Sequence, residues 1–154
     1  MWQRKQTIFL ALTGTLMVLM IFFPAWVAEM DGQKRELSPL YFSTTVDGVK
    51  STVYFPYALS AILAIAAATI AFMEIAKFEN RMTQIKMGAL NSLVMAGSLM
   101  ALVYFATQLI KSSQAAGQYG LALWLPAGAM ICNMIANRFI RRDERLVRDS
   151  ERIR

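Results

Sequence analysis

The sequence has no histidine and only one cysteine, Cys132. Without histidine, the chain cannot form His-dependent catalytic triads, His-ligated haem sites or nearly all known catalytic zinc sites. A single cysteine can neither form a disulfide within the chain nor supply a metal cluster. The eight glycines are scattered, and none lies in the G-x-x-x-x-G-K loop that cradles phosphates. These absences predict a protein that is not an enzyme and that uses no metal or other cofactor.

Charged residues are also scarce and unevenly distributed. They make up 17% of the 154 residues, against roughly 25% in a typical globular domain. The stretches without any Asp, Glu, Lys or Arg are 7–28, 51–73, 87–110 and 115–137. Each contains an apolar core close to the roughly 20 residues that a helix needs to cross the hydrocarbon of a bilayer. None shows the polar stripe that a soluble amphipathic helix needs.

The sequence therefore predicts one membrane domain over residues 1–154, an all-α bundle of four antiparallel transmembrane helices. The expected spans are about 7–27, 56–73, 87–110 and 121–137. They are joined and followed by an outer loop over 28–55, an inner loop over 74–86 and a cytoplasmic helical tail over 138–154. Glu74 is the acid closest to a span, and we expect it at the inner interface beside Lys77. No span then carries an ionisable residue at mid-membrane, where such a residue would mark a proton or substrate path.

The basic residues predict the orientation of the chain. With four spans, both termini lie on the same side, where twelve Lys and Arg residues fall, against four on the opposite side. Because basic residues favour cytoplasmic loops, both termini are expected in the cytoplasm. Acidic residues cancel the four outer bases, so the whole net charge of +6 lies on the inner side. Aromatic residues near the predicted span ends, among them Trp26, Tyr54 and Trp124, fit an interfacial belt.

The outer loop contains a predicted β-hairpin over 40–55. Asp47-Gly48 is a favoured two-residue turn between two segments of alternating apolar and polar residues. Pairing outward from this turn gathers an apolar set on one face: Leu40, Phe42, Val46, Val49, Val53 and Phe55. A lone two-stranded hairpin is only marginally stable in water. This face is therefore expected to cap the outer ends of the helices, and the alternative is that it docks a partner outside the membrane.

Two asparagines and several small residues stand out within the predicted spans. Ser60, Ala64 and Ala68 recur every four residues, a spacing that lets another helix approach closely. Asn91 and Asn133 are expected to form hydrogen bonds between helices, worth about 0.6 to 2 kcal/mol each. The alternative is that these two amides line a path for a solute.

The tail over 138–154 has seven arginines, four acids and no lysine. Phe139, Leu146 and Ile153 recur every seven residues, which predicts a helix with a narrow apolar seam among charges. Arg145–Asp149 and Glu144–Arg148 are spaced to form ion pairs along it. A nucleic-acid-binding arm would not neutralise its own arginines with four acids, so no nucleic acid is expected. The alternatives are arginines that meet lipid phosphates and a seam that binds another protein or a second copy.

Several motifs resemble a bacterial family of four-span membrane proteins known as domain of unknown function 4293. Gln3-Arg4 and Gln6-Thr7 lead into the first span, and Phe23-Pro24 lies at its far end; later in the chain the motifs are Asn80-Arg81, Gln84, Lys86 and Leu125-Pro126. In the tail they are Ile140, Arg142-Asp143-Glu144, Leu146-Val147-Arg148, Ser150, Arg152 and Arg154. The resemblance extends over essentially the whole chain. It implies an integral protein of a bacterial inner membrane and no established activity.

The residues that carry the resemblance are mostly charged and fall on the predicted cytoplasmic side. They predict an interaction surface made by the inner loop and the tail: Asn80, Arg81, Gln84, Lys86, Arg142, Asp143, Glu144, Leu146, Val147, Arg148, Arg152 and Arg154. Arg81 or Lys86 is expected to pair with Asp143 or Glu144. A chain that ends after Asn137 is then expected to remain folded but to lose its partner.

The function predicted from the sequence is that of a non-enzymatic scaffold or accessory subunit in an inner-membrane assembly. Its expected partners are the lipid bilayer and either another membrane protein or a second copy of the chain. The alternative is a small transporter or channel for a neutral or lipid-like solute, lined by Asn91, Asn133 and the small-residue faces.

Overall fold

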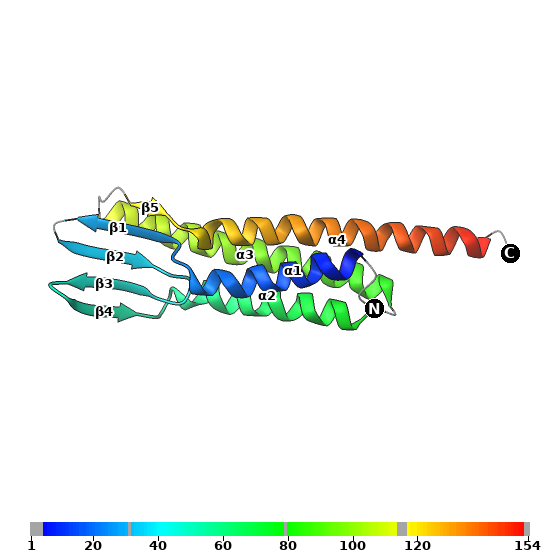
Figure 1. Ribbon diagram of the computed structural model, residues 1–154, viewed down its shortest axis with the longest axis horizontal. Helices are drawn as coiled ribbons and strands as arrows, with labels where there is room; N and C mark the ends of the chain where they lie inside the picture. Colours follow the sequence, from blue (N-terminus) through cyan, green and yellow to red (C-terminus); the bar gives the residue numbers. More distant parts are fainter. Residues whose placement is uncertain (1–4, 31, 79, 114–116, 153–154) are drawn as a thin grey trace.

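The computed structural model describes residues 5–30, 32–78, 80–113 and 117–152, with side chains as far as Asp149. Four helices lie side by side along the long axis, and a five-stranded antiparallel sheet extends from one end of them (Figure 1). The fold therefore combines α and β structure, and the predicted all-α bundle is wrong. We call the end with the sheet the sheet end, and the end where α1 begins and α4 ends the tail end.

The helices are α1 (Lys5–Leu19), the short 3-10 helix η1 (Met20–Phe22), α2 (Ala58–Ala76), α3 (Arg81–Ser113) and α4 (Leu121–Arg152). α1 packs against α2 and α4, and α3 packs against the same two helices. The buried stripe of α2 includes residues four or three apart: Ser60, Ala64, Ala67, Ala71 and Glu74. Apart from Glu74 these are small residues, which lets the neighbouring helices approach closely.

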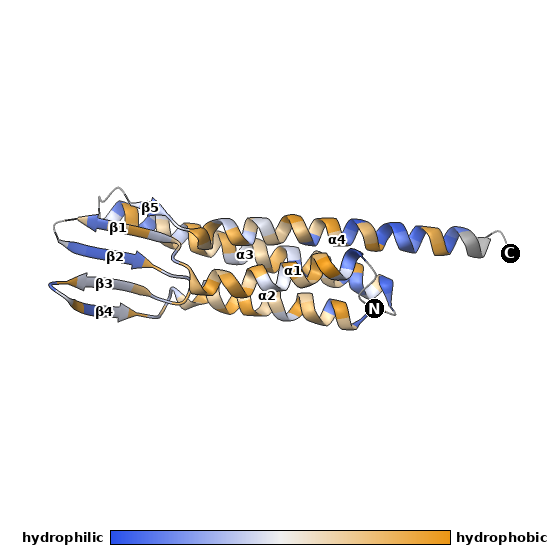
Figure 2. Cartoon of the chain, in the orientation of Figure 1, coloured by the Kyte–Doolittle hydropathy of each residue, from blue (hydrophilic) through white to orange (hydrophobic). Residues whose placement is uncertain are grey.

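Three segments are long and apolar enough to cross a membrane: Lys5–Phe22, Ala58–Ala76 and Arg81–Ser113. Among the described residues, α4 is not a fourth, so the prediction of four spans is corrected to three candidates. The reason is composition: Pro126, Asn133 and Asn137 interrupt the apolar run of α4, and charges begin at Arg138. Figure 2 shows the resulting change, with α4 apolar in its first half and largely hydrophilic toward its C-terminal end.

The sheet contains β1 (Trp26–Met30), β2 (Gln33–Leu37), β3 (Phe42–Val46), β4 (Val49–Val53) and β5 (Gln118–Tyr119), in the order β4-β3-β2-β1-β5. The predicted hairpin is β3–β4, in which Val46 pairs with Val49. Asp47 and Gly48 have φ angles of 49° and 82°, as the two-residue hairpin turn requires. Residues 26–37, predicted as span and loop, form the neighbouring hairpin β1–β2. Pro24 helps to end the first helical segment before this hairpin, because the residue before a proline favours extended backbone, as Phe23 adopts.

The sheet contacts the helices mainly through β1 and β2. Trp26 and Leu37 are fully buried in the same apolar cluster as Met20 and Ala122. In contrast, Val49 is 73% exposed and Phe55 is 84% exposed. Of the predicted apolar face of the β3–β4 hairpin, Phe42 packs against the buried cluster, with its ring centre 5.5 Å from that of Tyr57. The rest of this face is exposed, so the predicted cap over the helices is limited to Phe42. Trp26 is a core residue and not part of an interfacial belt.

Backbone hydrogen bonds fix the junction between the sheet and the helices. Gly120 N donates to the Ala25 carbonyl oxygen over 2.8 Å, and Ala122 N donates to the Pro24 carbonyl oxygen over 3.2 Å. From α2, the Ser60 hydroxyl donates to the Pro39 carbonyl oxygen over 2.8 Å. The sheet is thus attached to the starts of both α2 and α4.

Candidate functional site

The predicted inner-loop residues lie at the tail end, where the connection between α2 and α3 meets α4. Asn80 precedes α3, and its side-chain oxygen accepts a hydrogen bond from Thr83 N over 3.1 Å, as an N-cap residue does. The Arg81 guanidinium donates to the carbonyl oxygen of Asp143 over 2.8 Å. The contact expected between these two residues therefore exists, but it goes to the backbone and not to the carboxylate. It attaches the start of α3 to α4.

Gln84 lies in the interior of the tail end. It is 1% exposed, and its side-chain nitrogen donates to the Glu74 carbonyl oxygen over 2.8 Å. Glu74 is fully buried, and neither of its carboxylate oxygens has a hydrogen-bond partner among the described residues. Glu74 lies in the last turn of α2 close to Lys77, as expected, but its side chain is buried between the helices and does not reach an aqueous surface. Its position on the buried stripe of α2, three residues after Ala71, was the sequence signal for its burial.

The predicted tail residues form part of the surface of α4. Leu146 is 60% exposed and Val147 is 40% exposed, and Lys86 and Arg148 are also exposed. The predicted ion pairs Arg145–Asp149 and Glu144–Arg148 are absent from the described side chains. The predicted residues that lie outside the described part are Gln3, Arg4, Ile153, Arg154 and the side chains of Ser150 and Arg152.

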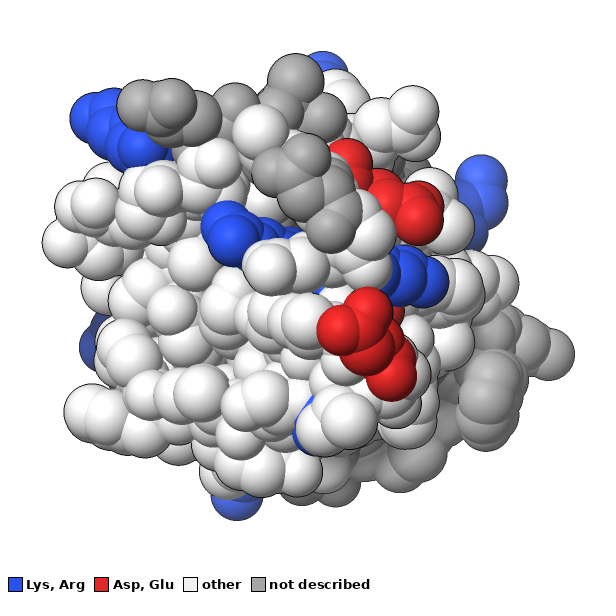
Figure 3. Space-filling view, turned by 90° about the vertical axis from the view of Figure 1, so that its left-hand side faces the viewer, with Lys and Arg blue, Asp and Glu red and all other residues white. Residues whose placement is uncertain are grey.

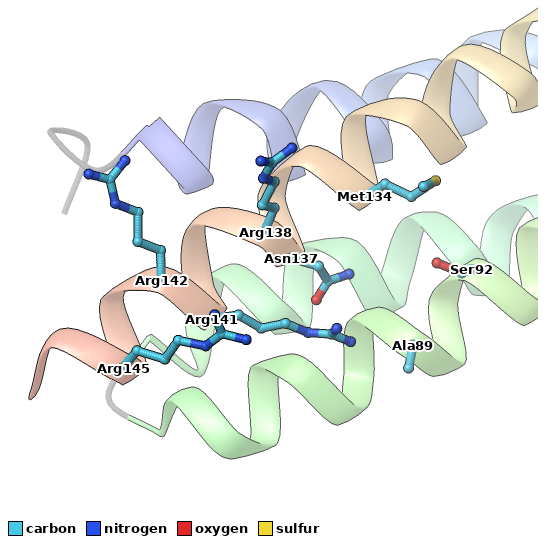
Figure 4. Close-up of a pocket in the computed structure, with 8 residues that line it drawn as sticks. All are labelled: Ala89, Ser92, Met134, Asn137, Arg138, Arg141, Arg142 and Arg145. Atoms are coloured by element: carbon cyan, nitrogen blue, oxygen red, sulfur yellow. The ribbon is translucent and has the colours of Figure 1, made fainter. Parts of the chain in front are cut away.

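A cleft of about 550 Å³ lies between α3 and α4 at the tail end. We call it the arginine cleft, and its lining residues are Ala89, Ser92, Met134, Asn137, Arg138, Arg141, Arg142 and Arg145. Four of these residues are arginines and none is acidic. In Figure 4, Arg141 extends from α4 toward the turn of α3 that carries Ala89.

The sequence predicted only one of the four arginines of this cleft, Arg142, as a site residue. The signal for the others was their spacing along α4. Asn133, Asn137, Arg141 and Arg145 follow one another every four residues, so they lie along one side of the helix. Reading the tail as a separate solvated segment concealed this continuity with the first half of α4.

Asn133 lies next to the cleft and is fully buried. Its side-chain nitrogen donates to the Gly88 carbonyl oxygen and to the Ser92 hydroxyl, each over 2.9 Å. Asn91 is also fully buried, but neither polar atom of its side chain has a partner among the described residues. Asn133 therefore joins α4 to α3, and no described hydrogen bond joins it to Asn91.

The fold and this site define a class of protein: an α+β chain with three helices of membrane-spanning length and composition and a basic cleft at one end. Within the described ranges, no cluster of three or more His, Cys, Asp and Glu residues could hold a metal ion. The chain belongs to the family described as domain of unknown function (DUF4293), whose model matches residues 2–153. The resemblance noted from the sequence is thus confirmed. Among curated proteins, none matches the chain.

Proposed function

We propose that the protein is a non-enzymatic scaffold or accessory subunit, anchored in a membrane by α1, α2 and α3, whose projecting end of α4 binds a partner. The observation that carries this proposal is the length of α4. At the tail end it extends beyond the connection between α2 and α3 (Figure 1), and there Leu146 is 60% exposed. A large apolar side chain on a projecting helix is a typical anchor for another helix or groove.

The apolar outer surface of the helices supports membrane anchorage. On the faces turned away from the core, Ile62 is 61% exposed, and Leu93 and Met100 are each 72% exposed. Contiguous apolar surface of this kind is uncommon on a soluble monomer. In a bilayer the same side chains contact lipid tails, which are equally apolar.

Charge distribution supports placing the tail end in the cytoplasm of a bacterial inner membrane. Both termini are on that side, because α4 runs back beside α1 and α3 and ends at the end where α1 begins (Figure 1). Most of the sixteen Lys and Arg residues are in α1, the α2–α3 connection, the start of α3 and the second half of α4. The sheet end has Lys and Arg side chains close to Asp and Glu side chains, with uncharged surface around them (Figure 3). The tail end thus has an excess of basic residues, whereas basic and acidic residues occur together at the sheet end. The positive-inside rule places the end with the excess of basic residues in the cytoplasm.

The test of the scaffold proposal is native capture of a partner. An epitope inserted at the β3–β4 turn leaves the tail end unmodified, and the protein is purified in a mild detergent. We expect a second protein to co-purify at fixed stoichiometry with the full chain. Deletion of residues 146–154, or Leu146→Glu, is expected to abolish its recovery, because both remove the exposed apolar anchor.

Lys77→Gln is the control, since Lys77 is exposed at the tail end but lies outside α4 and outside the predicted interaction surface. It is expected to retain the partner. Two results would contradict the proposal: a full-length chain that purifies alone, and a partner recovered equally well with residues 146–154 deleted.

The second candidate function is a small transporter or channel, and the observation in its favour is the arginine cleft beside buried polar residues. However, neither Asn91 nor Asn133 lines this cleft, and four of its lining residues are cationic. Such a lining does not match a neutral solute. The scaffold proposal therefore remains the better supported of the two.

A further inference from the structure

We infer that the arginine cleft binds the headgroup phosphate of an anionic phospholipid, with an acyl chain against the adjoining apolar surface of α3 and α4. This inference rests on the membrane anchorage proposed above. It assigns a ligand to a cleft that the scaffold proposal does not use.

The positive charge of the cleft is not compensated by the described residues around it. Arg138, Arg141, Arg142 and Arg145 lie within about two turns of α4, where like charges three or four residues apart repel one another. None of the four guanidinium groups forms a hydrogen bond or ion pair with a described residue. Among the described residues, the four cations therefore lie along one cleft without an anion paired to them. Arginine binds phosphate especially well, because its planar fork donates two parallel hydrogen bonds.

An apolar surface of α4 continues from the cleft. Ile131 and Met134 precede Arg138 by seven and four residues, and they are 59% and 65% exposed. Across the cleft, α3 contributes Ala89 and Ser92. One side of α4 thus changes from apolar to cationic along its length, as a phospholipid changes from acyl chain to phosphate. A free phosphate would match only the cationic half.

The wall of the cleft also includes Asn137. The side-chain oxygen of Asn137 is buried and has no hydrogen-bond partner among the described residues. The Asn137 amide is packed over the backbone of Gly88, so closely that a Cβ at position 88 would overlap it. Asn137 therefore adds a polar side chain to a cleft that is lined by four arginines and no acidic residue. Such a lining favours an anionic headgroup, as in phosphatidylglycerol, over the zwitterionic headgroup of phosphatidylcholine.

Native mass spectrometry of the detergent-solubilised full chain tests the inference directly. The protein is titrated with dioleoylphosphatidylglycerol or with dioleoylphosphatidylcholine, and bound lipid is counted. We expect one phosphatidylglycerol to bind in clear preference to phosphatidylcholine. Arg141→Gln should weaken phosphatidylglycerol binding about fivefold, and Arg141→Gln with Arg145→Gln about tenfold to thirtyfold, with phosphatidylcholine binding unchanged.

Arg148→Gln is the matched control, because it removes one exposed charge from the same helix outside the cleft. It should bind phosphatidylglycerol as the wild-type chain does. The double variant Arg141→Lys, Arg145→Lys keeps both positive charges and should retain most of the binding. Its binding also shows that substitution at these two positions leaves the protein folded. Equal binding of the two lipids, or an equal loss in Arg148→Gln, would overturn the inference.

Soluble anions distinguish a lipid site from a free-phosphate site. Glycerol 1-phosphate and inorganic phosphate should not displace the lipid at concentrations comparable with it, because they lack the acyl chain. Displacement by either at such concentrations would show that the cleft is a site for free phosphate. Carbonate washing of membranes tests the anchorage proposal independently of lipid binding in the cleft. The wild-type chain and every variant should remain in the pellet, and release of the wild-type chain would contradict anchorage itself.

Discussion

Gly120→Ala is expected to destabilise the protein by about 3 kcal/mol or more. Gly120 lies between β5 and α4, and a Cβ at this position would overlap the carbonyl oxygen of Pro24. The two segments cannot move apart freely, because Gly120 N donates to the Ala25 carbonyl oxygen over 2.8 Å. Ala122 N adds a second bond to the Pro24 carbonyl oxygen over 3.2 Å. Relief of the overlap would therefore cost hydrogen bonds at the junction of sheet and helices.

Thermal unfolding in detergent measures this effect, and Gly128→Ala is its control. In Gly128→Ala the new Cβ would lie 3.8 Å from the nearest atom, the Cδ1 of Leu16, which is an ordinary contact. Alanine also favours a helix by up to about 1 kcal/mol over glycine, so the control should be as stable as the wild-type chain or more so. Equal unfolding temperatures for Gly120→Ala and the wild-type chain would show that the junction is not tightly packed.

Ending the chain after Asn137 is expected to destabilise the tail end by about 3 to 6 kcal/mol. The truncation removes Ile140, which is fully buried and packs with Leu10 and Ala136. It also removes the ring of Phe139, which stacks on Phe9 with the ring centres 5.9 Å apart. The carbonyl oxygen that accepts from Arg81 is lost as well. The first turns of the supposed tail therefore belong to the core, and a chain ending at Asn137 should not remain well folded.

Ending the chain after Arg145 is the comparison, since it keeps all of these contacts and the whole arginine cleft. This shorter deletion should change the unfolding temperature little, because the side chains it removes lie on the surface. Size-exclusion profiles and thermal unfolding of the two truncated chains give the result. If both were equally stable, the packing of Phe139 and Ile140 would contribute nothing measurable.

The sequence predicted the β3–β4 hairpin and its register because Asp47-Gly48 is an unambiguous turn signal between alternating segments. It did not predict β1–β2, although Asp31-Gly32 repeats the same pair of residues. The segment after that pair contains three consecutive charged residues, Lys34, Arg35 and Glu36, and such a composition is more typical of a loop than of a strand. Strand pairing with β1 and β3 overrides that local preference.

At the tail end, the sequence indicated that the inner loop and the tail would meet, which the Arg81–Asp143 contact agrees with. The error was to divide α4 into a span and a separate tail. A helix has one continuous set of faces, so the side of α4 that begins with Asn133 and Asn137 continues into Arg141 and Arg145. The burial of Glu74 was missed for a related reason, because an acid near a span end was assumed to reach water.

The central claim is that the sheet end and the tail end lie on opposite sides of a membrane, and cysteine labelling tests it most directly. Cys132→Ser removes the only cysteine of the chain, and Val49→Cys or Arg148→Cys then places a single thiol at an exposed position on one end or the other. Spheroplasts are treated with a membrane-impermeant maleimide. The account predicts that the thiol at position 49 is labelled in intact spheroplasts and that the thiol at position 148 is labelled only after permeabilisation. Equal labelling of both in intact spheroplasts, or labelling of position 148 alone, would contradict it.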